Sequence, residues 1–168
     1  MNMNTLQIQT SSFSEIRTYL TAAFFIAGNI LLPWICHLIP SGGPMLLPIY
    51  FFTLIGSYLY GWKAGLLTAI ASPLLNFILA GMPSAEALPA IMIKSVLLTA
   101  AASVAARRFD RPTLLILLAV VMVYQIAGTF AEWAISGDLY VSLQDFRIGI
   151  PGMAVQVLAS YLILRKAS

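Results

Sequence analysis

Lys94 and Glu132 are charged side chains that stand inside long apolar stretches of the sequence. Lys94 lies about six residues, or roughly 9 Å of helix, into the stretch 88–106. A lysine this deep in a membrane-spanning helix costs on the order of 3 kcal/mol unless it faces protein or a wet cavity. Two interpretations stay open: Lys94 contacts a bound ligand, or it forms an ion pair with Glu132 at comparable depth. Both can hold in a site whose charges stay paired until a ligand arrives.

The stretch 112–135 carries a polar face. Gln125 and Glu132 are seven residues, or two helical turns, apart, so they lie on one side of the helix with Gly128 close beside them. In an otherwise apolar helix, such a face has to point into the protein. We therefore expect both side chains to contribute to a buried polar site.

Further polar residues extend this candidate site. Lys94, Glu132 and Arg147 all fall in the outer half of their segments, where a cavity would open to the outside. The sequence predicts that Lys94 binds a carboxylate, phosphate or other oxygen-rich group of a ligand, with Arg147 at the rim. The remaining candidate ligand contacts are Gln125, Asn76, Gln156, His37 and Tyr50. For Asn76 and Gln156, amides that only satisfy packing are the alternative.

No catalytic or metal-binding set is recognisable. Cys36 and His37 are neighbours and would point in different directions on a helix, so they do not indicate a metal site. The sequence has no HExxH, no Gly-x-Ser-x-Gly and no phosphate-binding glycine loop, and its single histidine leaves little for acid–base chemistry. We expect no enzyme activity, no catalytic residues and no cofactor or metal in this chain.

The composition places these residues in lipid. Of 168 residues, 60% are hydrophobic and 9% are charged, whereas soluble proteins are about 45–50% apolar and about 25% charged. So few polar side chains cannot cover the outside of a water-soluble domain of this size. A nucleic-acid binder with a basic surface is excluded on the same ground. The single cysteine also excludes an internal disulfide.

Pro, Gly and polar residues divide the chain into six apolar segments. A spanning helix takes roughly 20 residues, so 168 residues hold at most about six spans and no separate soluble domain. The sequence predicts one integral-membrane domain over 1–168, an all-α bundle of six transmembrane helices. The predicted spans are about 13–38, 45–60, 64–80, 88–106, 112–135 and 148–165.

The cations set the predicted orientation, because short cytoplasmic loops collect Lys and Arg. With both termini cytoplasmic, seven of the nine cations lie at cytoplasmic ends: Arg17, Lys63, Arg107, Arg108, Arg111, Arg165 and Lys166. The acids Glu86, Asp138 and Asp145 then lie outside. We expect a multi-pass protein of a bacterial or archaeal cell (inner) membrane.

Ala23 and Ala27 form a pair of small residues one helical turn apart in the first segment. Such pairs let another helix approach closely. A partner helix and packing inside the bundle are both open from the spacing alone.

Three stretches together resemble the substrate-binding membrane subunits, or S components, of energy-coupling-factor (ECF) vitamin transporters. The sequence Leu32-Pro33-Trp34-Ile35-Cys36-His37, with the glycine loop and Leu47-Pro48-Ile49-Tyr50, resembles the family's LPxxxH, glycine turn and LPMHIP. Residues 61–83 are similar to its YGxxxGLxSPLLxxxLxGMP. Residues 149–156 resemble its sixth-helix GxPGxxxQ.

The resemblance implies a six-helix subunit that captures a vitamin or related micronutrient from outside with high affinity. It also implies partners: a transmembrane coupling subunit, which would dock on Ala23 and Ala27, and two cytoplasmic ATPases that consume ATP. Tyr50 stands where related members often carry His, and Lys94 where they often carry Glu. The resemblance therefore does not identify the specific substrate of this chain.

Two alternatives remain beside an ATP-driven transport subunit. One is a solitary uptake protein of the same fold, for cobalamin if Cys36 or His37 could ligate cobalt. The other is a structural membrane protein whose polar residues only pack.

Overall fold

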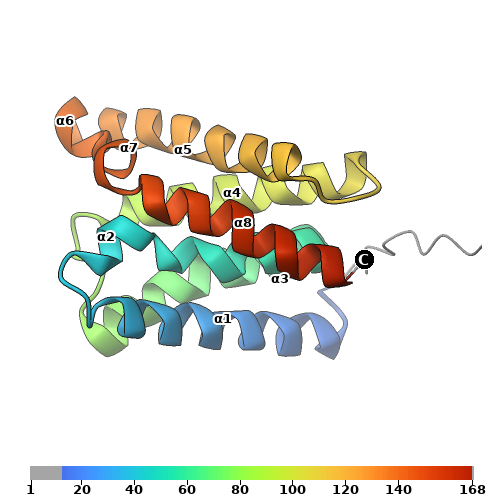
Figure 1. Cartoon of the computed structure of the whole chain (residues 1–168). Coiled ribbons are helices and arrows are strands. Elements are labelled where there is room, and N and C mark those ends of the chain that lie inside the picture. Colours follow the sequence, from blue (N-terminus) through green and yellow to red (C-terminus); the bar gives the residue numbers. More distant parts are fainter. Residues whose placement is uncertain (1–12, 168) are drawn as a thin grey trace, which may run out of the picture.

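The computed structural model describes residues 13–167, and all regular elements in this part of the chain are helical. The helix order is α1 (Ile16–Cys36), α2 (Gly42–Leu46), the 3-10 helix η1 (Pro48–Tyr50), α3 (Phe51–Ala80), α4 (Leu88–Arg108), α5 (Leu114–Ser136), α6 (Leu139–Ser142), α7 (Gln144–Ile148) and α8 (Ile150–Ala167). The long helices lie side by side in a bundle (Figure 1). The prediction of an all-helical protein is confirmed for the described residues.

Four of these segments are long and apolar enough to cross a membrane: Ile16–Cys36, Pro48–Ala80, Leu88–Arg108 and Leu114–Ser136. They indicate a multi-pass membrane protein. The final helix α8 has 18 residues, carries Gln156, Arg165 and Lys166, and is not among the four.

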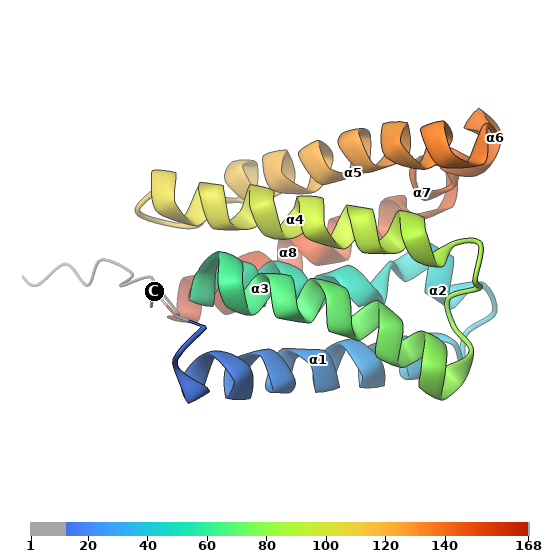
Figure 2. The same cartoon turned by 180° about the vertical axis from the view of Figure 1, so that it is seen from behind.

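Helix α3 reverses direction at Gly61 and is a helical hairpin. Gly61 has φ 77° and ψ −171°, a conformation open essentially to glycine alone. In a straight helix, Thr53 and Ser72 would lie about 28 Å apart. The side-chain nitrogen of Asn29 instead donates to both hydroxyls, at 2.8 and 3.2 Å. The two halves of α3 therefore run antiparallel, as Figure 2 also shows.

The hairpin occupies the place of the predicted spans 45–60 and 64–80, with two differences. The glycine segment, expected to be a loop, forms the short helix α2. This helix ends at Leu46, and Leu47, with its positive φ of 48°, separates it from η1. The predicted loop 136–147 likewise contains α6 and α7. In both places a polar or backbone group caps a single turn, a local event that hydrophobic periodicity does not report.

The short elements gather at one end of the bundle. Figures 1 and 2 show α2, α6, α7 and the α3–α4 connection at the end opposite the C-terminus. The same end carries Glu86 and Asp138, whereas α4 and α8 close at the other end with Arg107, Arg108, Arg165 and Lys166. The molecule is therefore electrically asymmetric along its long axis.

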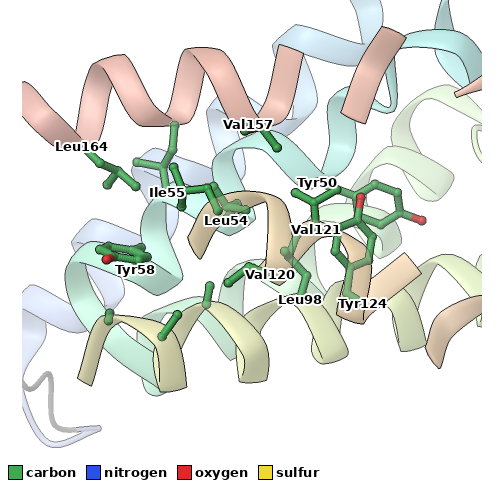
Figure 3. Close-up of a cluster of buried hydrophobic side chains, with 14 of the residues drawn as sticks. Tyr50, Leu54, Ile55, Tyr58, Leu98, Val120, Val121, Tyr124, Val157 and Leu164 are labelled. Carbon is green, nitrogen blue, oxygen red and sulfur yellow. The ribbon is translucent and has the colours of Figure 1, made fainter. Parts of the chain in front are cut away.

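The apolar core lies between α3, α4, α5 and α8. Leu54, Leu98, Val121 and Leu164 are buried there with other aliphatic and aromatic side chains. Figure 3 shows Tyr50 and Tyr124 together at one end of this cluster and Tyr58 toward the other. The ring centres of Tyr50 and Tyr124 are 5.3 Å apart. The core thus ends in aromatic side chains at the end of the bundle that holds the short helices.

Gly65 lies where the two halves of the hairpin meet α4. A Cβ at this position would collide with Ser57 Oγ and come within 2.8 Å of Thr99 Cγ2. We expect Gly65→Val to lower the free energy of unfolding by about 1–3 kcal/mol through overpacking, measured by thermal unfolding in detergent. The matched Ala154→Val on the exposed face of α8 should change it little. Equal stability of both variants would contradict the hairpin packing.

Candidate functional site

A cavity of about 650 Å³ opens at the end of the bundle that holds α2, α6 and α7. This volume is typical of sites that take a small organic molecule. The wall is largely apolar and comes from every part of the chain between α1 and α7. Its polar and charged members are His37, Tyr50, Asn76, Ser84, Glu86, Lys94, Glu132, Ser136, Asp138, Gln144 and Asp145.

Lys94 lies on the cavity wall between two carboxylates. Its Nζ is 2.6 Å from Glu132 Oε2 and 2.9 Å from Asp145 Oδ2, and the side chain is 4% exposed. These are the two salt bridges formed within residues 13–167. The sequence predicted the pair with Glu132 as one of two alternatives, and that pair is present. The ligand contact stays a prediction.

Asp145 is the member of this cluster that sequence analysis missed. It was expected among the acids of an outer loop, but α7 (Gln144–Ile148) turns its side chain inward, where it is 12% exposed. Its position in a polar segment gave no periodicity from which burial could be inferred. The one available signal was electrostatic: a lysine buried in a span needs its full complement of acceptors.

Gly128 makes room for the lysine. A Cβ on Gly128 would collide with Cγ of Lys94 and lie 3.3 Å from its Cδ and Cε. The aliphatic part of Lys94 therefore lies directly on the backbone of α5, and this contact directs the ammonium group toward Glu132, one helical turn further along. On the face of α5 that was predicted to be polar, Gly128 contacts the aliphatic part of Lys94 and Glu132 binds its ammonium group.

Asn76 closes a gap that a proline opens in α1. Pro33 has no N–H, so the carbonyl of Asn29, four residues earlier, loses its helical donor. Asn76 Nδ2 donates to that carbonyl at 2.9 Å and to Ser72 O at 2.9 Å. Both contacts need the NH₂ group, which fixes the orientation of the amide. The side-chain oxygen is left on the cavity wall without a hydrogen-bond partner among the described residues.

Gln156 does not line the cavity and instead holds one of its walls. Its amide nitrogen donates to Leu47 O at 3.2 Å, and its oxygen accepts from the hydroxyl of Tyr124 at 2.9 Å. Leu47 lies between α2 and η1, so this bond ties that connection to α8. Gly152 allows the approach, because a Cβ there would collide with the backbone of Leu46. Gln156 therefore acts as a packing amide, the alternative stated for it above.

His37 stands at the mouth of the cavity. Its Nδ1 lies 2.7 Å from Pro33 O, and since a carbonyl only accepts, Nδ1 is the donor. In the neutral ring, Nε2 then remains as an acceptor beside Gly43. Cys36 is buried in α1 and is not one of the residues on the wall. Within residues 13–167, no cluster of three or more His, Cys, Asp or Glu could hold a metal ion.

Two predicted ligand contacts lie away from the cavity. The guanidinium of Arg147 lies 3.6 Å from the ring centre of Tyr140 and donates to its hydroxyl, with both residues exposed. Gln125 is fully buried in α5 and is not one of the residues that line the cavity. Within the described residues, Lys94 is therefore the one Lys or Arg on the wall.

Ala23 and Ala27 are exposed on α1, on the side facing away from the bundle. Ala22, which precedes the pair, and Phe25, which lies between its members, are buried on the other side of the helix. Packing of the alanine pair inside this subunit is thus excluded, and its docking role stays a prediction.

Comparisons of the chain with protein-family models, with curated proteins and with solved structures found no match. The function is therefore inferred from the cavity and from the sequence motifs around it.

The ion triad gives a stability prediction. Lys94→Met leaves Glu132 and Asp145 together without a cation, and we expect a loss of about 3 kcal/mol in the free energy of unfolding. Neutralising all three groups (Lys94→Met with Glu132→Gln and Asp145→Asn) should restore most of it. Thermal unfolding in detergent measures both, with the exposed Lys166→Met as the control. A Lys94→Met protein as stable as the parent would contradict the triad.

Proposed function

We propose that this chain is the substrate-binding membrane subunit of an ECF-type transporter, which captures a vitamin or related micronutrient for ATP-driven uptake. The observation that carries the proposal is the cavity of about 650 Å³ at one end of a helical bundle, with a buried ion cluster on its wall. A protein with only structural duties has no need to keep charges beside an open cavity, where they cost stability.

The motifs that resemble the S-component family support the proposal by converging on the cavity. Pro33, His37, Pro48 and Tyr50 from the first motif line it, as do Met82 and Pro83 at the end of the second. The glycines of the third motif allow α8 to approach Leu46 and Leu47 on the opposite side. The first two motifs thus line the cavity, and the third supports its wall from behind.

The proposed topology has cytoplasmic termini and six membrane crossings. The crossings are α1, the two halves of α3, α4, α5 and α8. The support for this topology is the charge asymmetry along the bundle, since Lys and Arg accumulate on the cytoplasmic side. In this orientation the cavity opens to the outside, where a capture site has to be. The membrane would be that of a bacterial or archaeal cell, because the ECF family serves such cells.

In the proposed assembly, α1 contacts the coupling subunit through Ala23 and Ala27, and two ATPases complete the complex. The exposure of both alanines supports this arrangement, because small side chains at the surface let a partner helix approach closely. This chain binds the micronutrient, and ATP is used by the partners.

The anionic ligand group expected from the sequence has less support than the capture function. That prediction required either Lys94 or Arg147 to be available to pair with the ligand. In the structure, Lys94 is shared between two carboxylates and Arg147 lies over Tyr140.

Purification from a host that expresses the ECF module tests the function. We expect mass spectrometry to find a small molecule bound to the chain and the coupling subunit and ATPases to co-purify with it. Ala23→Trp should abolish co-purification of the partners and keep the bound molecule, because the added bulk lies outside the subunit. Ala154→Trp on the exposed face of α8 is the matched control. A parent protein that retains neither a small molecule nor any partner would refute the proposal.

Cysteine labelling tests the topology. In a Cys36→Ala background, a membrane-impermeant maleimide should label Ser41→Cys on intact cells and Asp110→Cys only after permeabilisation. Both positions are exposed, one in the connection before α2 and the other between α4 and α5. Labelling of both positions from the same side would rule out the six-crossing arrangement.

A further inference from the structure

The ion triad at the cavity carries one unbalanced negative charge. Lys94 supplies a single positive charge, and Glu132 and Asp145 supply two negative ones, all with side chains less than one-fifth exposed. Two more carboxylates, Glu86 and Asp138, stand further out on the same wall. A buried charge without a counterion is costly, so the side chains of the wall by themselves favour a cation beside the two carboxylates.

No second cation of the described chain corrects this imbalance. Arg147, the nearest candidate by sequence, lies over the exposed ring of Tyr140 and is not on the cavity wall. The cations Arg107, Arg108, Arg165 and Lys166 are at the far ends of α4 and α8. With both carboxylates ionised, no Lys or Arg side chain of the described residues is left on the wall to balance the second one, which favours a cationic ligand.

Two buried polar side chains on the wall also lack partners. Tyr50 and Asn76 are each 2% exposed and both line the cavity. Among the described residues, neither the hydroxyl of Tyr50 nor the side-chain oxygen of Asn76 forms a hydrogen bond. The amide orientation fixed by Asn29 and Ser72 makes the free atom of Asn76 an acceptor. Neither atom is among the sealed, unsatisfied polar atoms of the core, so both face the cavity and are open to a ligand that donates hydrogen bonds.

We infer that the cavity takes a small organic cation, an apolar body with a protonated amine, amidine or charged nitrogen ring that lies against Glu132 and Asp145. This inference rests on the proposed capture function and specifies its substrate class. The apolar wall, with Leu47, Ile91 and Ile135 among its members, accommodates the body of the ligand. Asn76 and Tyr50 accept further N–H groups.

The same geometry disfavours an anion. Lys94 donates two of its three protons to Glu132 and Asp145, so an anionic group would meet at most one remaining N–H. It would also approach two carboxylates that attract cations and repel it. A ligand cation instead brings the cluster to neutrality without breaking either salt bridge.

Three probes of nearly the same shape test the charge preference: benzamidinium, benzamide and benzoate, which are positive, neutral and negative. The full chain is purified in detergent, washed free of small molecules, and titrated with each probe at millimolar concentration by calorimetry and thermal unfolding. We expect benzamidinium to bind about tenfold more tightly than benzamide, the effect of one charge-assisted hydrogen bond, and benzoate to bind more weakly than either. This comparison uses the unaltered protein and depends on no variant.

Isosteric variants locate the effect. Asp145→Asn and Glu132→Gln should each weaken benzamidinium binding about tenfold and leave benzamide binding unchanged. The matched controls Asp110→Asn and Glu15→Gln remove the same charges at the far end of the bundle and should change neither.

The outcomes separate this inference from the function on which it rests. Equal binding of the three probes, or tightest binding of benzoate, overturns the cationic ligand and leaves a functioning capture site. Loss of benzamidinium binding in the far-end controls as well as in the triad variants also overturns it, because the effect is then not local. Binding of none of the probes, with no small molecule in the purified protein, refutes capture itself.

Discussion

The ammonium group of Lys94 is the constraint on which the end of the bundle with the short helices depends. A lysine inside a membrane span needs acceptors nearby, and the chain supplies them from two other elements, α5 and α7. Both contacts have structural consequences. Gly128 has to be free of a side chain so that the lysine stem lies on α5, and α7 has to turn inward so that Asp145 reaches the ammonium. The short helices are thereby drawn over the end of the bundle, and a cavity with a charged wall remains beneath them.

A second polar cluster joins α1 to both halves of α3. Asn29 is fully buried, and its amide nitrogen reaches Thr53 in one half and Ser72 in the other, while its oxygen accepts from the backbone of Phe52. The backbone carbonyl of Asn29, freed by Pro33, accepts from Asn76. The side-chain nitrogen, the side-chain oxygen and the backbone carbonyl of Asn29 thus all form hydrogen bonds to α3. Since neither half of α3 can slide along α1 without losing these bonds, they fix the register of the cavity wall.

Much of the fold follows from apolar segments and their breaks. The long helices α1, α4 and α5 begin and end close to the predicted residues, because Gly, Pro and charged residues interrupt hydrophobicity there. The pairing of Lys94 with Glu132 was one of the two alternatives that their comparable depth predicted. Three features could not be predicted in this way: the inward turn of Asp145, the engagement of Arg147 with Tyr140, and the role of Gln156 in holding Leu47. Asp145 and Arg147 lie in a short polar segment that carries no periodic signal, and the partner of Gln156 depends on the path of the connection between α2 and η1, which hydrophobicity does not report.

Polar contacts attach the parts of the wall that close the cavity, beside the apolar packing of Leu47 and Phe146 against the core. Asp145 anchors α7 through Lys94, Gln156 anchors the connection between α2 and η1 through Leu47 O, and Asp138 caps α6. Elements held by a few polar contacts are the least costly to displace, whereas the apolar core between α3, α4 and α5 stays intact. A bound cation would neutralise the excess charge beside Lys94 and so strengthen the hold on Asp145. Occupancy of the site and the hold on α7 are then linked through Asp145, and a ligand without positive charge lacks that link.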